Sequence, residues 1–320
     1  MSVDDIAYHG FMAATDMTAV VTGPTRGLGL DTTMALAREG VRLVLMGRDA
    51  GRLDTVAATA RSAGSPQVVT VECDFASLTS VRDACAEVAK RVATSDLGRL
   101  DLVIGNAGLQ FNDRRNQSVD GYEATFAVNV LANHVLIRSL VDSAKPSAHV
   151  VVVGSGTHFG NTRLVAAPVW AAPEMLAAPG DGGAPFDAGS SKAGQCAYST
   201  SKLAVNYLVH AWQRHHAGSM RFNIYDPGLM PGTGLVRTGP AIRQWAWRRV
   251  MPALQLFPGV TTTKNSAEHL TAFGLGHRYS DARAAYVEIE NLSQASKASR
   301  NPEREQQLWD FCESVLPDPN

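Results

Sequence analysis

The sequence predicts an α/β fold in which helices cover both faces of a doubly wound parallel sheet of seven strands. Short apolar runs alternate with longer helical patterns along most of the chain, as in strand–helix–strand units. Residues 150–153 are four valines, and a strand without polar positions is expected where helices cover both faces. The seven predicted strands are residues 18–22, 41–46, 68–72, 102–105, 149–154, 222–225 and 285–289.

Two helices have boundaries that the sequence marks. The helix predicted over residues 28–39 ends at Gly40, which suits a C-terminal cap because glycine adopts the left-handed conformation easily. Asn301 and Pro302 begin a final helix, because an asparagine side chain caps free N–H groups and proline is tolerated at the first helical position.

One domain accounts for most of the 320 residues, since α/β domains with insertions often reach this length. We expect an N-terminal extension over residues 1–17 and a single catalytic domain over residues 18–316. An insertion at 156–195, rich in Ala, Pro and Gly, interrupts the alternation, and so does a segment at 229–263 that is rich in Pro, Trp and Arg. Such segments are commonly lids or binding loops, and the second is predicted to be a substrate lid.

The composition argues against several classes of protein. Apolar residues make up 45% of the chain and charged residues 18%, which is typical of a soluble globular protein. The net charge is -1 and no dense basic run occurs, so a nucleic-acid partner is not expected. The acidic start is unlike a signal peptide, and no apolar run reaches about 18 residues, so we expect a cytoplasmic protein without a spanning segment.

The cysteines and histidines do not predict a metal site. The chain has no CxxC pair and no HExxH motif, and its cysteines lie far apart, which favours reduced buried thiols. The cysteines are Cys73, Cys85, Cys196 and Cys312.

A glycine-rich turn follows the first predicted strand and precedes the first helix. Glycines let the backbone approach a pyrophosphate, and the helix start presents free N–H groups to it. The spacing differs from GxGxxG, and a tight turn without a ligand is the alternative, but the position in the fold favours a nucleotide. The residues predicted to contact the cofactor are Thr22, Gly23, Thr25, Arg26, Gly27, Leu28 and Gly29.

The end of the second strand predicts which dinucleotide binds. An acidic residue near this point binds the ribose of NAD, whereas an arginine accommodates the 2′-phosphate of NADP. Arg48 follows this strand, and Arg26 supplies a second cation, so NADP(H) is favoured. Asp49 is an opposing charge, although its position suits the N-cap of the next helix. A solvated surface cation is the alternative interpretation of Arg48.

Two more strand ends carry residues suited to a cofactor that crosses the sheet edge. Asp74 and Phe75 follow the third strand, where the carboxylate could accept a hydrogen bond from the adenine amino group or cap a helix. Asn106, Ala107 and Gly108 follow the fourth strand, and such small residues leave room for a cofactor, although alone they indicate only a turn.

Tyr198 and Lys202 start a helical pattern, and their spacing puts them about 6 Å apart on one face. Free tyrosine titrates near 10, so lowering its pKa by about three units needs about 4 kcal/mol of phenolate stabilisation. A nearby ammonium and a cationic nicotinamide could supply it. By itself such a pair occurs commonly by chance and is more often structural.

Two polar residues could complete this site. Ser155 ends the fifth strand, at the sheet edge where ligands bind, and could orient a substrate carbonyl. Asn129 lies within an apolar helical stretch and needs a hydrogen-bond partner if it is buried. Two roles stay open for Asn129: a hydrogen bond between helices, or holding a water molecule in a proton relay.

In combination and in this order, the motifs resemble the short-chain dehydrogenase/reductase family across about residues 18 to 315. The resemblance implies a Rossmann-like fold, a catalytic tetrad and contacts of Tyr198 and Lys202 with the nicotinamide side of the cofactor. It also implies that Pro227-Gly228 flanks the nicotinamide. Thr233 would take the place of the threonine that the family carries after this turn, although it lies one residue further along the chain than usual. The tetrad would be Asn129, Ser155, Tyr198 and Lys202, and the phosphate loop Gly23, Gly27 and Gly29.

Finer similarity points to the branch that contains retinol dehydrogenases and light-dependent protochlorophyllide reductases. The stretches that carry it are residues 129–134, 153–155 and 227–235, the long insertion before Tyr198 and the C-terminal residues 293–316. The resemblance implies a cysteine directly after Pro-Gly for the pigment reaction, but this chain has Leu229.

The expected activity is therefore NADPH-dependent reduction of a carbonyl, or oxidation of the matching alcohol, on a fairly large apolar or aromatic small molecule. Light-driven reduction of a tetrapyrrole double bond and a non-catalytic NADP sensor are the alternatives. The segment 235–258 carries aromatic residues and arginines, so a pocket wall, a membrane-surface contact and ordinary core packing all stay open. The oligomeric state does not follow from the sequence.

Overall fold

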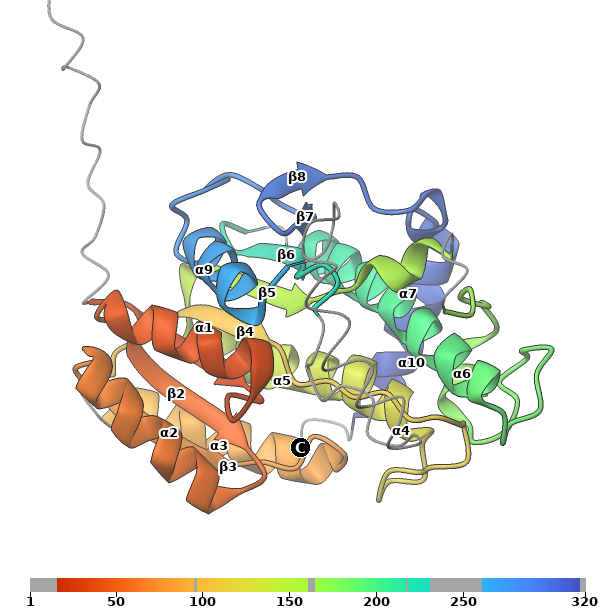
Figure 1. The fold of residues 1–320 in the computed structure, drawn as a ribbon, viewed down its shortest axis with the longest axis horizontal. Coiled ribbons are helices and arrows are strands. Elements are labelled where there is room, and N and C mark those ends of the chain that lie inside the picture. The colour runs from red at the N-terminus through yellow and green to blue at the C-terminus, as the bar shows by residue number, and fades with distance from the viewer. Residues whose placement is uncertain (1–15, 95–96, 161–164, 217, 231–260, 317–320) are drawn as a thin grey trace, which may run out of the picture.

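The computed structural model describes residues 16–94, 97–160, 165–216, 218–230 and 261–316, arranged around one eight-stranded sheet (Figure 1). The strand order is β3-β2-β1-β4-β5-β6-β7-β8. The strands are β1 (Thr18–Thr22), β2 (Arg42–Gly47), β3 (Val68–Glu72), β4 (Leu100–Gly105), β5 (Ala144–Val153), β6 (Arg221–Asp226), β7 (Tyr286–Glu288) and β8 (Asn291–Ser293).

The predicted doubly wound sheet is confirmed, with one strand added. Strands β1 to β7 pair in parallel, whereas β8 runs antiparallel to β7. The predicted seventh strand ends early because Ile289 has a φ of 52° and turns the chain back. A branched side chain rarely adopts this left-handed conformation, so the apolar pattern alone favoured a continuous strand.

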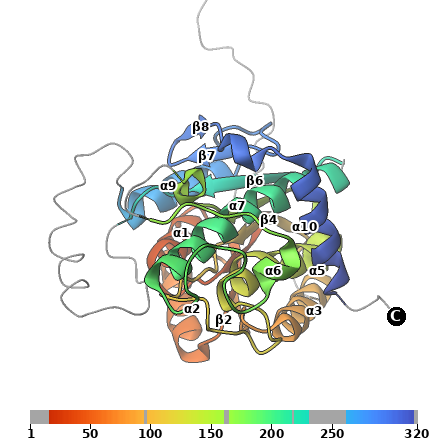
Figure 2. The same ribbon diagram turned by 90° about the vertical axis from the view of Figure 1, so that its right-hand side faces the viewer.

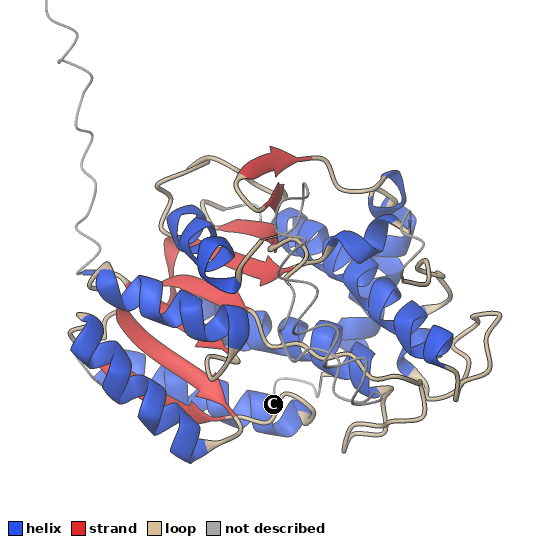
Figure 3. Ribbon diagram, in the orientation of Figure 1, coloured by secondary structure: helices blue, strands red, loops and turns tan. Residues whose placement is uncertain are grey.

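Helices cover both faces of the sheet, as Figures 2 and 3 show. Leu36 and Leu270 belong to the core on the face of α1, α2 and α9, whereas Val81 and Leu208 belong to the core on the face of α3, α5, α7 and α10. The helices are α1 (Gly27–Arg38), α2 (Ala50–Ala63), α3 (Leu78–Thr94), α4 (Ala124–Phe126), α5 (Ala132–Leu140), α6 (Pro173–Ala177), α7 (Ser191–His215), α9 (Thr263–Gly274) and α10 (Pro302–Ser314).

The predicted helix caps are confirmed. The Asp49 side chain accepts a hydrogen bond from the Arg52 N–H at 3.0 Å, and the Asn301 side chain accepts one from the Arg304 N–H at 3.0 Å. Helix α1 is followed by Gly40, which has a φ of 75° and therefore suits glycine. A cap depends on residues a few positions apart in the chain, so these helix boundaries could be predicted from the sequence around them.

One helical stretch of the described chain, Ala124–Ser143, is long and apolar enough to cross a membrane. It comprises α4, a π-helical segment at Ala127–Leu131, α5 and a final 3-10 turn. Within its most apolar window, 89% is buried inside the protein, against the sheet and α3. A helix buried on nearly all sides is apolar all round, so this stretch is a core helix.

The region of the predicted insertion, 156–195, contains more helix than its composition suggests. It holds a 3-10 turn at Gly156–Phe159, helix α6 and the first residues of α7. Helix α7 begins at Ser191, where the Ser190 side chain accepts a hydrogen bond from the Ala193 N–H at 3.2 Å. Tyr198 therefore lies inside the helix and not at its start, which corrects the predicted boundary.

A buried arginine fastens this insertion to the loop after β4. Arg114 is 2% exposed, and its guanidinium donates to the carbonyls of Gly180 at 2.9 Å, Leu176 at 3.0 Å and Ala178 at 3.1 Å. These carbonyls lie in and just after α6, where a helix leaves its last acceptors unpaired. The side chain thus supplies the donors that the end of α6 lacks.

Candidate active site

The predicted site residues gather at the carboxyl ends of the parallel strands, where ligands bind in sheets of this kind. The sheet order reverses at β1, which lies between β2 and β4. The glycine-rich turn leaves β1 at this point, and the polar residues after β4, β5 and β6 lie along the same edge.

The turn after β1 is shaped by its glycines. Gly23 and Gly27 have φ values of 64° and 55°, a conformation that other residues rarely adopt. A Cβ placed on Gly29 would lie 2.2 Å from the Gly23 carbonyl oxygen, so only glycine permits this tight turn. The Arg26 side chain makes no capping hydrogen bond, and the first turn of α1 carries no acidic residue. The helix start is therefore a suitable place for an anion, and a dinucleotide phosphate fits it.

Thr22 and Asn106 hold the loops after β1 and β4 together. The Thr22 hydroxyl accepts hydrogen bonds from the N–H groups of Asn106 at 2.9 Å and Ala107 at 2.8 Å. The Asn106 amide donates to the carbonyl of Thr22 at 2.8 Å and to that of Gly23 at 3.2 Å. Both side chains were predicted to contact cofactor, and the structure shows them building the rigid frame of its candidate site.

The two predicted phosphate-binding arginines lie at the same sheet edge. Arg26 and Arg48 are both exposed. Asp49, the opposing charge, is engaged elsewhere, because it caps α2 and forms an ion pair with Arg52 at 3.2 Å. Two exposed guanidinium groups beside the turn fit a 2′-phosphate, which binds arginine through charge-assisted hydrogen bonds.

Asp74 forms a local turn, and its neighbour Ser77 begins the following helix. The Asp74 carboxylate accepts a hydrogen bond from the Ala76 N–H at 3.0 Å, whereas Ser77 accepts one from the Ser80 N–H at 3.2 Å. Capping this helix was one of the two roles predicted for Asp74, and the residue that caps it is Ser77. Phe75 is half-buried against the core on the α3 face. A contact of these residues with adenine stays a prediction.

Tyr198, Lys202 and Ser155 come together as predicted. Both α7 side chains are 6% exposed, and the Lys202 ammonium lies 5.7 Å from the centre of the Tyr198 ring. Lys202 donates a hydrogen bond to the Val153 carbonyl at 2.7 Å, which ties α7 to the end of β5. Ser155 follows at the end of this strand and hydrogen-bonds the Tyr198 hydroxyl.

Ser155 is itself oriented by its neighbours. Its hydroxyl oxygen accepts hydrogen bonds from the Thr157 N–H at 3.3 Å and from the Thr157 hydroxyl at 3.2 Å. The contact with Ser155 lowers the pKa of Tyr198. Thr157 occupies both acceptor positions of the Ser155 oxygen, so the Ser155 O–H is left to donate at the candidate site, where a carbonyl oxygen would be held.

Burial sets the protonation of the pair. It raises the pKa of Tyr198 well above the usual range, and it lowers the pKa of Lys202 to about 8. The sequence-based expectation was a tyrosine pKa lowered by a nearby ammonium, and in the protein alone the direction is opposite. The reason is desolvation, which disfavours a buried phenolate. Tyr198 is accordingly a protonated phenol, which is the form that an acid catalyst needs.

Asn129 lies in the π-helical segment and bridges two parts of the site. Its amide donates to the Leu109 carbonyl at 3.0 Å and the Ser201 hydroxyl at 2.9 Å, and its side-chain oxygen accepts from the Leu109 N–H at 2.9 Å. This is the structural bonding that was one of its two predicted roles. Single-turn π-helices are frequent at functional sites, and the role in a proton relay stays a prediction.

The Pro227-Gly228 turn leaves β6 beside the same group of side chains. Gly228 has a φ of 74°, and the buried Ser266 hydroxyl donates to the Pro227 carbonyl at 2.8 Å. Leu229 follows with 40% of its surface exposed. Thr233 and the segment 231–260, which was predicted to be most of the substrate lid, lie outside the described residues, as do residues 1–15 of the N-terminal extension.

Two residues near the tetrad escaped the sequence analysis. Asp226 ends β6 with 2% exposure, and His158 lies three residues after Ser155 with 1% exposure. The His158 ring bonds the Ser155 carbonyl at 2.8 Å through Nδ1 and accepts from the Ser296 N–H at 3.1 Å through Nε2. The only signal for Asp226 was an acidic residue directly before Pro-Gly at a strand end, and that signal was missed.

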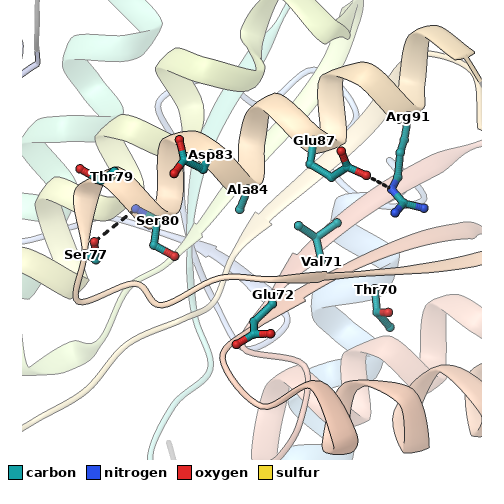
Figure 4. Close-up of a pocket in the computed structure, with 10 residues that line it drawn as sticks. All are labelled: Thr70, Val71, Glu72, Ser77, Thr79, Ser80, Asp83, Ala84, Glu87 and Arg91. Carbon is teal, nitrogen blue, oxygen red and sulfur yellow. Dashed lines mark hydrogen bonds and ion pairs between the residues drawn. The ribbon is translucent and has the colours of Figure 1, made fainter.

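A separate polar groove lies between β3 and α3 (Figure 4). The carboxylates of Glu72, Asp83 and Glu87 line it, and Glu87 pairs with Arg91 at 2.6 Å. None of the predicted tetrad lines this groove, so it is distinct from the candidate active site.

Comparison with known proteins agrees with this geometry. A family model for short chain dehydrogenases matches residues 17–172. Together with the relatives and solved structures below, this match supports a member of the short-chain dehydrogenase/reductase family. The predicted branch is also confirmed, since protochlorophyllide reductase B of Hordeum vulgare is 29% identical over 327 residues, covering 93% of this chain and 78% of that protein.

Other members of the family match over shorter lengths. Oxidoreductase calI of Penicillium decumbens is 28% identical over 251 residues, which is 75% of this chain and 66% of that protein. The candidate daunorubicin C-13 ketoreductase DnrU of Streptomyces sp. (strain C5) is 42% identical over 124 residues, 38% of this chain and 41% of that protein. The chain thus spans less than two thirds of each of these two relatives.

The fold has solved counterparts. An alcohol dehydrogenase from Thermococcus sibiricus, complexed with 5-hydroxy-NADP, superposes with a TM-score of 0.59 at 22% identity, covering 87% of this chain and 99% of that one. At this identity the likeness concerns the fold. Membership of a family of oxidoreductases supports the same class of reaction and a nicotinamide cofactor for this chain.

Proposed function

We propose that this protein reduces the carbonyl group of an apolar or aromatic small molecule with NADPH, or oxidises the matching alcohol. The observation that carries the proposal is the contact of the buried Tyr198 hydroxyl with Ser155, with the Lys202 ammonium 5.7 Å from the centre of the Tyr198 ring. The similarity to a candidate ketoreductase supports the same reaction class.

The reaction follows from what these side chains can donate. A reduced nicotinamide, when bound, supplies the hydride. Ser155 donates a hydrogen bond to the carbonyl oxygen and orients it, and Tyr198 gives its phenolic proton to the same oxygen as the alcohol forms. The phenolate that remains would be costly in a buried site, and the Lys202 ammonium offsets this cost. Alcohol oxidation uses the same groups in reverse.

The residues present fit the proposed cofactor. The open start of α1 suits a pyrophosphate, and a Cβ on Gly108 would lie 3.2 Å from the Asn129 side-chain oxygen, so glycine suits the close approach of this loop to the predicted tetrad. Lys202 would hold the nicotinamide ribose there, and Arg26 and Arg48 would hold the 2′-phosphate.

The preference for NADPH can be tested on Arg48. Arg48→Ala removes a charged hydrogen bond to the 2′-phosphate, worth about 1.5 to 3 kcal/mol, so NADPH affinity should fall by about 10- to 150-fold while NADH affinity stays the same. Fluorescence titration with both cofactors measures this. Arg38→Ala is the matched control, since Arg38 is an exposed cation at the opposite end of α1. Equal affinity of the native protein for NADPH and NADH would refute the assignment.

Protochlorophyllide reduction is the second candidate, because the similarity covers nearly the whole chain. Leu229 stands where the resemblance implies a cysteine, and a leucine side chain has no exchangeable proton. The four cysteines, Cys73, Cys85, Cys196 and Cys312, are all buried, and burial raises the pKa of each thiol. None of them offers a reactive thiolate in place of the missing cysteine.

A paired light and dark experiment separates the two candidates. We expect dark consumption of NADPH with at least one member of a panel of quinones, retinoids, steroids and aromatic polyketide ketones. We expect no change in protochlorophyllide absorbance when the pigment, NADPH and protein are illuminated. Leu229→Cys, which restores the thiol, tests whether that residue is what the pigment reaction lacks. Formation of the reduced pigment by the native protein would overturn the carbonyl assignment.

A further inference from the structure

Asp226 is a buried carboxylate at the end of β6 that the predicted tetrad does not include. One of its oxygens accepts a hydrogen bond from the Gly228 N–H at 2.9 Å, and the other accepts one from the Tyr286 hydroxyl. The first contact closes the chain around Pro227 and fixes the turn. The second joins the turn to β7, since Tyr286 is the first residue of that strand.

The carboxylate also lies close to the catalytic groups. A Cβ on Gly156, the residue after Ser155, would lie 3.3 Å from the Asp226 oxygen that contacts Tyr286. Burial raises the pKa of Asp226 from its ordinary value, whereas the donors Tyr286 and Gly228 and the nearby Lys202 act to lower it. Both of its oxygens accept hydrogen bonds, as those of an ionised carboxylate do, and its charge raises the pKa of Tyr198 and of Lys202. The titratable groups that face it are His158 from the turn after β5, Tyr198 and Lys202 from α7, Tyr225 from β6, and Tyr286 and Glu288 from β7.

His158 does not neutralise this carboxylate. Its Nδ1 carries the proton, because its partner, the Ser155 carbonyl, can only accept. Its Nε2 accepts from the Ser296 N–H and is therefore unprotonated. Burial also lowers the pKa of His158 below its ordinary value, which favours the uncharged ring. Lys202 is thus the cation that faces Asp226 from the described elements around it.

Asn129, the remaining member of the predicted tetrad, makes its hydrogen bonds to other groups. Its side chain is bonded to Leu109 and Ser201, and its backbone carbonyl accepts from the Asn133 amide at 2.9 Å. The Lys202 ammonium donates to the neutral Val153 carbonyl. A buried ammonium is stabilised by a countercharge, and Asp226 provides one from the strand next to β5.

We propose that Asp226 is a positioning residue of the active site, which fixes the Pro227-Gly228 turn and places a buried negative charge opposite Lys202 and Tyr198. This inference rests on the proposed function, because Lys202 is taken to work as an ammonium in the reduction. A purely structural role would need only the hydrogen bonds of Asp226, whereas this role needs its charge.

Asp226→Asn separates the charge from the hydrogen bonds. The asparagine oxygen can still accept from Gly228, and its amide can donate to the Tyr286 oxygen. Loss of the negative charge lowers the pKa of Lys202 and of Tyr198, since Asp226 raises both. The alkaline fall of kcat/KM for carbonyl reduction should therefore move to lower pH, by about one unit for a neighbouring charge. Tyr286→Phe is the matched control, because it removes one hydrogen bond and keeps the charge, and its alkaline limb should stay in the native position.

A second readout does not need a substrate. Lys202 is placed to hold the nicotinamide ribose, so NADPH affinity, followed by fluorescence from about pH 6 to 10, should weaken as Lys202 loses its proton near pH 8. In Asp226→Asn this weakening should begin at lower pH. If NADPH binds but no carbonyl is reduced, the proposed function fails while this measurement still decides the role of Asp226. The inference would be overturned if the native protein and Asp226→Asn gave superimposable curves of NADPH affinity against pH. It would also be overturned if the variant lost NADPH affinity by the same factor at every pH.

Discussion

Tyr198→Phe should reduce turnover by about 10²-fold or more, the lower end of what general acid catalysis contributes. The substitution removes only the hydroxyl that Ser155 contacts and keeps the buried ring in place. The affinity for NADPH should therefore stay near native. Steady-state rates on a ketone identified by the substrate panel, together with a fluorescence titration of NADPH, measure the two effects separately.

Tyr207→Phe is the control for this experiment. Tyr207 lies on the same helix and is buried, and its hydroxyl donates to the Ala298 carbonyl away from the tetrad. This variant loses one hydrogen bond, which costs about 1 kcal/mol of stability, but should keep its turnover. Near-native turnover of Tyr198→Phe would show that another group delivers the proton.

Arg114→Met should destabilise the protein by about 3 kcal/mol, the scale of removing one partner of a buried charged contact. The carbonyls of Leu176, Ala178 and Gly180 lose their donor. The buried carboxylate of Glu123, whose pKa Arg114 acts to lower against the larger effect of burial, loses a nearby positive charge. The midpoint of urea unfolding should fall accordingly, with the slope unchanged.

Arg115→Met provides a matched comparison at the next position. Arg115 is exposed and forms a loose ion pair with Asp187 at 3.8 Å, so its loss should change stability by about 0.5 kcal/mol at most. Arg114→Met should also slow turnover, because the insertion contacts α7 beside Tyr198, where the Ser199 hydroxyl donates to the Ala166 carbonyl at 2.7 Å. Equal stability of the two variants would show that Arg114 does not hold the insertion.

Much of the candidate site could be predicted because its pattern is local. The turn from Gly23 to Gly29 joins a strand to the next helix, and the spacing of Tyr198 and Lys202 needs only a helix to bring them to one face. Asp49 and Asn301 cap helices through residues three positions away. In each case the interaction spans one turn of backbone, so the order of residue types is enough to predict it.

The sequence by itself therefore determined the doubly wound sheet, the glycine-rich turn after β1 and the pairing of Tyr198 with Lys202 on one helix face. The tertiary structure decided which distant groups meet and how burial changes their chemistry. The Asp226 and Tyr286 side chains are 60 positions apart, and those of His158 and the Ser296 backbone 138 apart, and no local pattern connects them. The rise in the pKa of Tyr198 likewise depends on how much water the packed chain excludes, because desolvation here outweighs the hydrogen bond from Ser155.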